Sequence, residues 1–263
     1  MELIKIDRER CNKDHICVNE CPAAVFTVGD DGFPFSDAES EARCISCGHC
    51  AAVCPKAALE WSGHDPLQLK QVETFGVDPE RVITALNSRR SVRRFSPDPV
   101  PPEIVSQVLD TSRYAPSASN IRPVKWLHIH GRPAMETIAA KTAEAIADLP
   151  AYGTFAKMWD KGVDMITRGA SSCIITYTEN PGGWEREDSA IGLTYAEIAS
   201  HSLGLGTCWG GLVTKAAKMN PELKDFLGLE ENAAVTGALF LGFPEVTFYR
   251  LPPRKEVEIR TIR

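Results

Sequence analysis

Two runs of residues near the start of the chain have the types and spacing needed to hold inorganic clusters. CISCGHCAAVCP, from Cys44 to Pro55, follows the pattern C-x2-C-x2-C-x3-C-P, and CNKDHICVNECP, from Cys11 to Pro22, repeats that spacing with Asp14 in the second position. Cysteines with two residues between them form a tight loop whose thiolates reach three corners of one iron–sulfur cubane. The sequence therefore predicts a small domain built around two iron–sulfur clusters, which would carry electrons.

The fourth cysteine of each run is expected to serve the other cluster. In two-cluster proteins with this motif, the cysteine that precedes the proline leaves its own loop and ligates the second cluster. The expected ligands are Cys11, Asp14, Cys17 and Cys54 for cluster one, and Cys21, Cys44, Cys47 and Cys50 for cluster two.

Asp14 is the unusual member of these sets. Its carboxylate is a hard oxygen donor, which suits iron in a sulfide cluster less well than a thiolate does, so the iron beside it should be exchangeable or absent. We expect cluster one to be 4Fe-4S with aspartate or water on one iron, or 3Fe-4S. The alternative is that Asp14 is a loop residue and cluster one is degraded. The three cysteines of that set remain in register, which argues against loss.

Disulfides and zinc are the competing explanations for the cysteines. The chain opens MELIKIDRER, without an apolar signal segment, so we expect a cytoplasmic protein whose thiols stay reduced. Zinc is the stronger rival, but zinc sites use paired C-x2-C knuckles and not four cysteines in one run closed by proline. His15 and His49 lie inside the runs and are left out of both ligand sets.

Composition divides the chain and excludes some partners. Seven of the nine cysteines fall before residue 55, and a module of that size would depend on its metal centres for stability. The net charge of −6 and the lack of a long Lys or Arg block argue against nucleic acid. Apolar stretches such as 233–243 are too short to span a bilayer, so no membrane partner is expected.

Periodicity predicts the elements that must position these residues. Short strands are expected at 3–6 and 25–35, and a helix is expected to begin at Pro79 with Asp78 as its cap. The later elements expected are a helix from 102, strands at 124–130, 173–178, 206–211 and 234–242, and helices at 134–146, 188–203 and 221–226. A central sheet covered by helices follows from this order, with class α+β or mixed α/β.

Three stretches in the larger part of the chain favour a phosphorylated, planar ligand. SRRSVRRF at 88–95 supplies guanidinium groups, which bind phosphate as a fork. APSASNIRP at 115–123 supplies small polar donors at a turn, and GLGTCWGG at 204–211 supplies glycines that let the backbone approach a flat ring. Taken in order and at these separations, the stretches resemble the nitroreductase superfamily of FMN enzymes over residues 80–263. The whole chain resembles the ferredoxin-fused branch of that family.

This resemblance implies an α+β chain with a ferredoxin-type domain at 1–63, a linker at 64–79, and an FMN-binding α/β domain at 80–263 whose central sheet is flanked by helices. It also implies an intimate homodimer in which the second of the three stretches comes from the partner subunit. The FMN contacts implied are Arg89, Arg90, Ser91, Arg93 and Arg254 for phosphate and ribityl, Pro116, Ser117, Ser119 and Asn120 across the dimer, and Cys208, Trp209, Gly210 and Gly211 near the ring. Many relatives carry Gln-Pro-Trp where this chain has Arg122-Pro123-Val124, so no contact is assigned to Arg122.

The function implied is an FMN-dependent oxidoreductase that passes electrons from the two clusters to flavin and on to a small electron-poor acceptor. Nitroaromatics, quinones and activated alkenes are the acceptor classes considered, with ferredoxin, flavodoxin or NAD(P)H as external donor. No catalytic side chain is assigned, because the cofactors carry the chemistry. The alternatives are a redox sensor or electron carrier without its own substrate, and a flavin-dependent reductive dehalogenase. The aromatic segment 149–169 fits core packing and a substrate pocket equally well.

Overall fold

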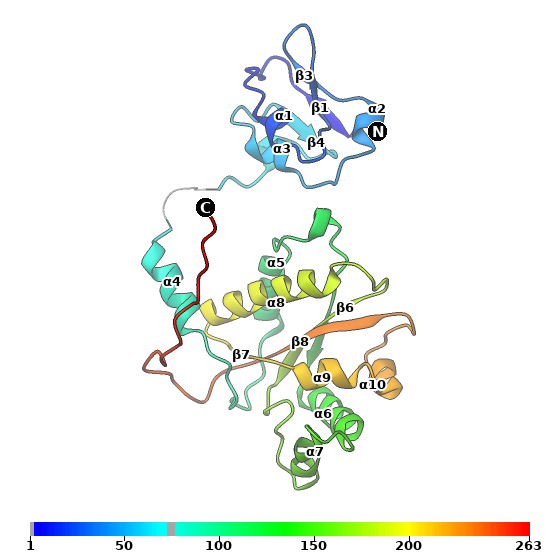
Figure 1. The fold of residues 1–263 in the computed structure, drawn as a ribbon, viewed down its shortest axis with the longest axis vertical. Helices are drawn as coiled ribbons and strands as arrows, with labels where there is room; N and C mark the ends of the chain where they lie inside the picture. Colours follow the sequence, from blue (N-terminus) through cyan, green and yellow to red (C-terminus); the bar gives the residue numbers. More distant parts are fainter. Residues whose placement is uncertain (1–2, 73–76) are drawn as a thin grey trace. The chain divides into compact units, whose positions relative to one another are not determined.

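The computed structural model describes residues 3–72 and 77–263, which divide into two compact units (Figure 1). The first holds the described residues up to 72 together with 119–121, and the second holds 77–118 and 122–263. Residues 73–76 of the linker expected at 64–79 lie outside the described part. Within that part, no helix is both long and apolar enough to cross a membrane.

The first unit is a small sheet and helix assembly around an apolar centre. Its elements are β1 (Ile4–Ile6), α1 (Ile16–Glu20), β2 (Thr27–Val28), β3 (Pro34–Phe35), α2 (Ala38–Glu41), α3 (His49–Val53), β4 (Leu59–Trp61) and the 3-10 turn η1 (Pro66–Gln68). β1 pairs antiparallel with β4, and the strand expected at 25–35 is the hairpin β2–β3. The core contains Ile4, Val25, Phe26 and Leu59. A core this small can contribute only modest stability, which fits a domain that depends on its clusters.

The second unit is built on one antiparallel sheet in the order β5–β6–β8–β7. Its strands are β5 (Lys125–His130), β6 (Ser172–Thr178), β7 (Gly206–Trp209) and β8 (Ala234–Gly242). Its helices are α4 (Pro79–Ser88), α5 (Pro102–Ser112), α6 (Arg132–Ile146), α7 (Gly153–Asp160), α8 (Glu185–Ser202), α9 (Gly211–Ala216) and α10 (Pro221–Phe226). The 3-10 turn η2 (Ala118–Asn120) follows α5 in the chain, and its last two residues group with the first unit.

Helices cover both faces of this sheet. α5 and α8 pack on one face, and α6, α7, α9 and α10 lie on the other (Figure 1). The alternation of side chains along a strand explains the two cores. In β6, Cys173 and Ile175 enter one core while Ile174 enters the other. In β8, Phe240 and Leu239 divide in the same way. Both strands are therefore buried along most of their length.

The expected helices and strands are present, and the predicted fold class is confirmed. The Asp78 carboxylate caps α4 by accepting the amide of Glu80 at 3.0 Å. α8 begins at Glu185, three residues earlier than expected, because the Glu185 carboxylate accepts the amides of Gly182 and Gly183 and closes the preceding loop. The strand expected at 206–211 ends at Trp209, and α9 replaces its last residues.

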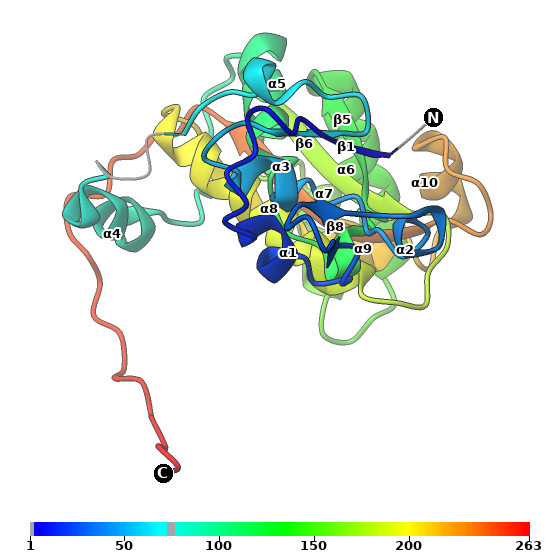
Figure 2. The ribbon, with the colours of Figure 1, turned by 90° about the horizontal axis from the view of Figure 1, so that it is seen from above.

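After β8 the chain runs as an extended segment to its C-terminus. Residues from 251 onward form no helix or strand, and they are exposed. Figure 2 shows this segment leading away from the helices of the second unit.

Candidate functional site

Four of the predicted cluster ligands line one small apolar cavity. Cys21, Cys44, Cys47 and Cys50 surround a hollow of about 20 Å3, whose other walls include Val25, Phe26 and Trp61. The Ser46 amide donates to the Cys44 Sγ atom at 3.4 Å, and the Val25 amide donates to the Cys21 Sγ atom at 3.4 Å. Amides that point at sulfur are the contacts expected around cluster thiolates.

α3 places Cys50 at the bottom of this cavity. The helix begins after Gly48, whose φ of 72° puts the backbone in the left-handed region that favours glycine. A Cβ atom at Gly48 would also lie 3.4 Å from the Trp61 ring. Burial raises the pKa of Cys50 to about 12, and the neighbouring Cys47, Cys44 and Cys21 add to the rise. Iron bound at this thiol would supply the positive charge that favours its thiolate form.

The other ligand set comes together in a similar way. Burial raises the pKa of Cys17 to about 11, with further contributions from Cys54, Cys11 and Asp14. The Ala58 amide donates to the Cys54 Sγ atom at 3.3 Å. The Asp14 Oδ1 atom accepts the amide of Ile16 at 3.1 Å, so this carboxylate also closes its own loop.

Among residues 3–72 and 77–263, no three His, Cys, Asp or Glu side chains converge tightly enough to hold a single metal ion. The ligands of a cubane bind separate iron atoms and need not converge on one point.

In the second unit, the arginine-rich segment lies directly beside β7. Ser91 forms a parallel bridge with Thr207, and the Val92 amide donates to the Thr207 carbonyl at 2.8 Å. Stretches 88–95 and 204–211, which are more than a hundred residues apart in the sequence, therefore form one wall. A cavity of about 290 Å3 opens there and is lined by Ser88, Arg89, Arg90, residues 204–207 and residues 246–248.

The arginines of this segment have different environments. The Arg90 Nη1 atom donates to the carbonyls of Asn87 and Arg89, both at 2.7 Å, while its Nε atom is buried and has no partner among residues 3–72 and 77–263. Arg89 is paired with the buried Glu197 at 2.9 Å. Arg93 is exposed and donates to the Ser91 carbonyl at 3.3 Å. A half-buried guanidinium with one unsatisfied N–H group, on a cavity wall, fits an anionic ligand group.

The end of β7 and the residues that follow it combine a buried cysteine with a tightly packed glycine. Burial raises the pKa of Cys208, and the nearby cations Arg93 and Arg168 oppose the rise. A Cβ atom at Gly210 would lie 2.9 Å from the Phe240 ring, so this glycine is required by packing against β8. A Cβ atom at Gly211 would meet nothing within 4 Å, which leaves that position open to a ligand.

The turn at 115–123 is held by hydrogen bonds from two sides. The Ala118 amide donates to the Asp188 Oδ1 atom at 3.0 Å, and the Arg122 amide donates to the Ser117 Oγ atom at 3.0 Å. Pro116 and Ser117 line a cavity of about 190 Å3. Ser119 and Asn120 have left-handed φ values of 48° and 54° and group with the first unit. Arg254, the remaining predicted contact, lies on the exposed C-terminal segment.

Two residues near β7, Arg168 and Glu197, were not identified from the sequence. Arg168 has a φ of 63° and follows a loop that Asp164 closes by accepting the amides of Ile166, Thr167 and Gly169. Glu197 lies in the second half of α8, where an acid among apolar residues resembles any solvent-facing residue. The only sequence signal for Arg168 is a charged residue before Gly169 at the entry to a buried strand.

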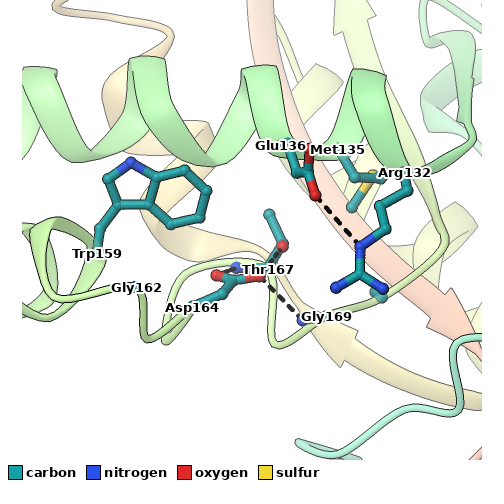
Figure 3. A pocket seen from close by; sticks show the side chains of 9 residues that line it. Arg132, Met135, Glu136, Trp159, Gly162, Asp164, Thr167 and Gly169 are labelled. Carbon is teal, nitrogen blue, oxygen red and sulfur yellow. Dashed lines mark hydrogen bonds and ion pairs between the residues drawn. The ribbon is translucent and has the colours of Figure 1, made fainter.

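A further cavity of about 280 Å3 lies between α6, α7 and the loop 162–170 (Figure 3). Trp159 and Arg132 reach into it from opposite ends, and Arg132 is paired with Glu136 at 3.2 Å. Tyr152, Phe155 and Trp159 all pack against the core of the second unit, and Trp159 also lines the cavity. The packing expected of the aromatic segment is therefore observed, and its use as a substrate pocket stays a prediction.

Comparison with known proteins identifies the two parts of the chain. The profile of the nitroreductase family matches residues 86–243, and that of the 4Fe-4S dicluster domain matches residues 9–59. The chain belongs to the nitroreductase family of oxidoreductases and carries an iron–sulfur domain at its N-terminus. The resemblance recognised in the sequence is confirmed.

Relatives and solved structures agree with this assignment. A Methanothermobacter thermautotrophicus protein, provisionally named NADH dehydrogenase/NAD(P)H nitroreductase, is 27% identical over 163 residues, which is 62% of this chain and 77% of that protein. A nitroreductase with bound FMN from Desulfitobacterium hafniense superposes with a TM-score of 0.59 at 20% identity, covering 69% of this chain and 97% of the other. Iodotyrosine deiodinase of Danio rerio is 48% identical over 44 residues, which is 17% of this chain and 15% of that protein.

Proposed function

We propose that the chain is an FMN-dependent oxidoreductase that passes electrons from two iron–sulfur clusters to flavin and then to a small electron-poor organic acceptor. The observation that carries the proposal is the wall formed by residues 88–95 and β7, in a chain that also gathers seven cysteines and Asp14 into two sets. Guanidinium groups that can bind phosphate lie beside a glycine-containing loop in this wall, and FMN binding requires both.

The residues proposed to hold FMN fall into three groups. Arg90, with its orphaned Nε atom, is the strongest candidate for the phosphate. The remaining proposed contacts are Arg89, Ser91, Arg93 and Arg254 in the phosphate and ribityl region, Pro116, Ser117, Ser119 and Asn120 from the partner subunit, and Cys208, Trp209, Gly210 and Gly211 near the ring. Bound FMN would supply the ability to take up electrons singly and release them as a pair.

The cluster ligands are proposed with the crossed pairing. The shared cavity of Cys21, Cys44, Cys47 and Cys50 supports a 4Fe-4S cluster at that set. Cys11, Cys17 and Cys54 stay in register beside Asp14, and the Ala58 amide donates to the Cys54 Sγ atom, which supports a second cluster, 4Fe-4S or 3Fe-4S, at the other set. The clusters would supply one-electron transfer at potentials that ligation tunes.

We propose a homodimer in which a second copy of this chain covers exposed apolar surface. Val82, Ile83 and Leu86 of α4 are 43%, 55% and 48% exposed. On the C-terminal segment, Tyr249 and Ile262 are each 85% exposed, and its other large apolar side chains are also open to solvent. Apolar side chains at this density on an extended segment fit a partner surface better than water. The dimer would also bring the partner subunit's turn at 115–123 to the flavin.

The acceptor is proposed to be a nitroaromatic, quinone or activated alkene, with reduced ferredoxin, flavodoxin or NAD(P)H as donor. The name of the Methanothermobacter relative supports nitro compounds and NAD(P)H among these. A second candidate function, flavin-dependent reductive dehalogenation, is favoured by the 48% identity over 44 residues to iodotyrosine deiodinase. The two functions share the cofactor and differ only in the bond that accepts the electron pair.

Anaerobic reoxidation of the reduced protein tests the proposal. Dithionite-reduced protein is mixed with a nitroaromatic, a quinone, an enone or a halogenated phenol, and flavin absorbance is followed with product analysis. Reoxidation by a nitro, quinone or enone compound supports the main proposal, and halide release supports the second candidate. A reduced flavin that persists with every compound refutes both and favours an electron carrier.

A further inference from the structure

A single buried carboxylate joins the arginine-rich segment to β7. Glu197 lies in α8 and is only 6% exposed. Its Oε1 atom accepts the Arg89 Nη1 group at 2.9 Å and the Thr207 hydroxyl at 3.1 Å. Its Oε2 atom accepts the Trp209 Nε1–H group at 3.3 Å.

The three donors come from two segments that the flavin site requires. Arg89 follows the end of α4, whereas Thr207 and Trp209 are alternate residues of β7, so their side chains leave the same face of the strand. A buried carboxylate is stable only when it is paired and hydrogen-bonded. Glu197 therefore constrains both segments at once, and Arg89 neutralises its charge. The Arg89 side chain remains 30% exposed and the Trp209 residue 41% exposed, so both can still meet a ligand.

We propose that Glu197 is a positioning residue of the flavin site. It fixes Arg89 and Trp209 as one rigid wall and sets the charge beside the cofactor, an inference that rests on the proposed FMN binding. Replacing the anion by a neutral group of the same shape leaves the Arg89 cation uncompensated. A more positive surrounding stabilises the reduced flavin, which carries more negative charge than the oxidised form.

The test compares Glu197→Gln with Glu185→Gln in the FMN-loaded full chain. Glu185 is a matched control, because it lies on the same helix and is 7% exposed, but its carboxylate accepts the loop amides of Gly182 and Gly183 and not the donors of β7. We expect Glu197→Gln to favour reduced flavin by about tenfold, which raises the two-electron midpoint potential by about 30 mV. Glu185→Gln should leave that potential unchanged.

A second readout needs no flavin. Because Glu197 accepts the indole N–H of Trp209, Glu197→Gln should shift the tryptophan emission of the flavin-free chain, and the shift should vanish in a Trp209→Phe background. Unchanged emission, or equal potentials in Glu197→Gln and the parent protein, overturns the inference. If the parent binds no FMN the proposed function fails, and the emission measurement alone then decides whether Glu197 positions β7.

Arg89→Met keeps the test decisive if Glu197→Gln does not fold. It leaves the Glu197 charge uncompensated, which disfavours reduced flavin. The midpoint potential should therefore fall by about 30 mV. A rise, or no change, in that variant also overturns the inference.

Discussion

Replacing Arg90 by methionine tests whether the cavity beside β7 binds the FMN phosphate. In the ligand-free protein the change removes two hydrogen bonds to the carbonyls of Asn87 and Arg89. Each is worth about 1 kcal/mol, and the loss is offset by removing the buried, unpartnered Nε–H group, whose burial costs about 1–3 kcal/mol. The free energy of unfolding should therefore change little, by about 1 kcal/mol or less.

Binding of FMN should respond very differently to the same change. A charge-assisted hydrogen bond from a guanidinium to phosphate contributes about 1.5–3 kcal/mol, so loss of Arg90 should raise the Kd for FMN by about 10- to 100-fold. The assay is titration of flavin-free protein with FMN, followed by flavin fluorescence quenching, beside a denaturation curve for each variant.

Arg94→Met is the control for this experiment. Its side chain is 73% exposed and pairs with Glu245 at 3.3 Å, and exposed pairs contribute about 0–1 kcal/mol. Neither FMN affinity nor stability should change much in that variant. An Arg90→Met protein that binds FMN as the parent does would refute the phosphate assignment. A large loss of stability in that variant would refute the account of its hydrogen bonds.

Three further perturbations test other parts of the account. Asp14→Cys should make the iron of cluster one harder to remove with a chelator, because thiolate suits that iron better than carboxylate; unchanged lability would mean that Asp14 is not near it. Burial lowers the pKa of His128 below its usual 6.5, so the unfolded chain takes up this proton more readily. The contribution of neutral His128 to the stability of the folded chain is complete above about pH 6.5 and is lost as the pH falls through the lowered pKa. His128→Gln should therefore flatten the decline of Tm in that pH window. A Cβ atom at Gly237 would lie 2.4 Å from the Leu193 Cδ1 atom, so Gly237→Ala should lower the free energy of unfolding by about 1–3 kcal/mol, whereas Gly211→Ala should not. Equal denaturation midpoints for these two variants would contradict the packing argument.

Features encoded locally could be predicted from the sequence. The cysteine runs have a spacing that specifies their chemistry, and Asp78 followed by Pro79 marks a helix start by a capping interaction within the same turn. The run at 173–178 is apolar and rich in β-branched residues, so a buried strand could also be predicted there. In each case the signal lies within about ten residues of the feature it predicts.

The features that could not be predicted depend on contacts between segments that are distant in the sequence. Gly210 and Gly211 indicated a ligand loop, but the first is required by packing on Phe240 and the second begins a short helix. The role of Glu197 could be inferred only from the fold, which brings Arg89 and β7 against α8. The position of Arg168 depends on the loop that Asp164 closes, and the hydrogen bonds of that loop are visible only in three dimensions. No periodicity argument could have found these partners.

Cofactor analysis of protein purified without oxygen tests the central claim most directly. Iron, acid-labile sulfide and flavin are quantified per chain, and the reduced and oxidised forms are examined by EPR. The account predicts about seven or eight iron atoms per chain, according to whether cluster one has three or four irons, with about eight sulfides in either case and about one FMN. Protein that holds zinc, with neither labile sulfide nor flavin after reconstitution, would contradict it.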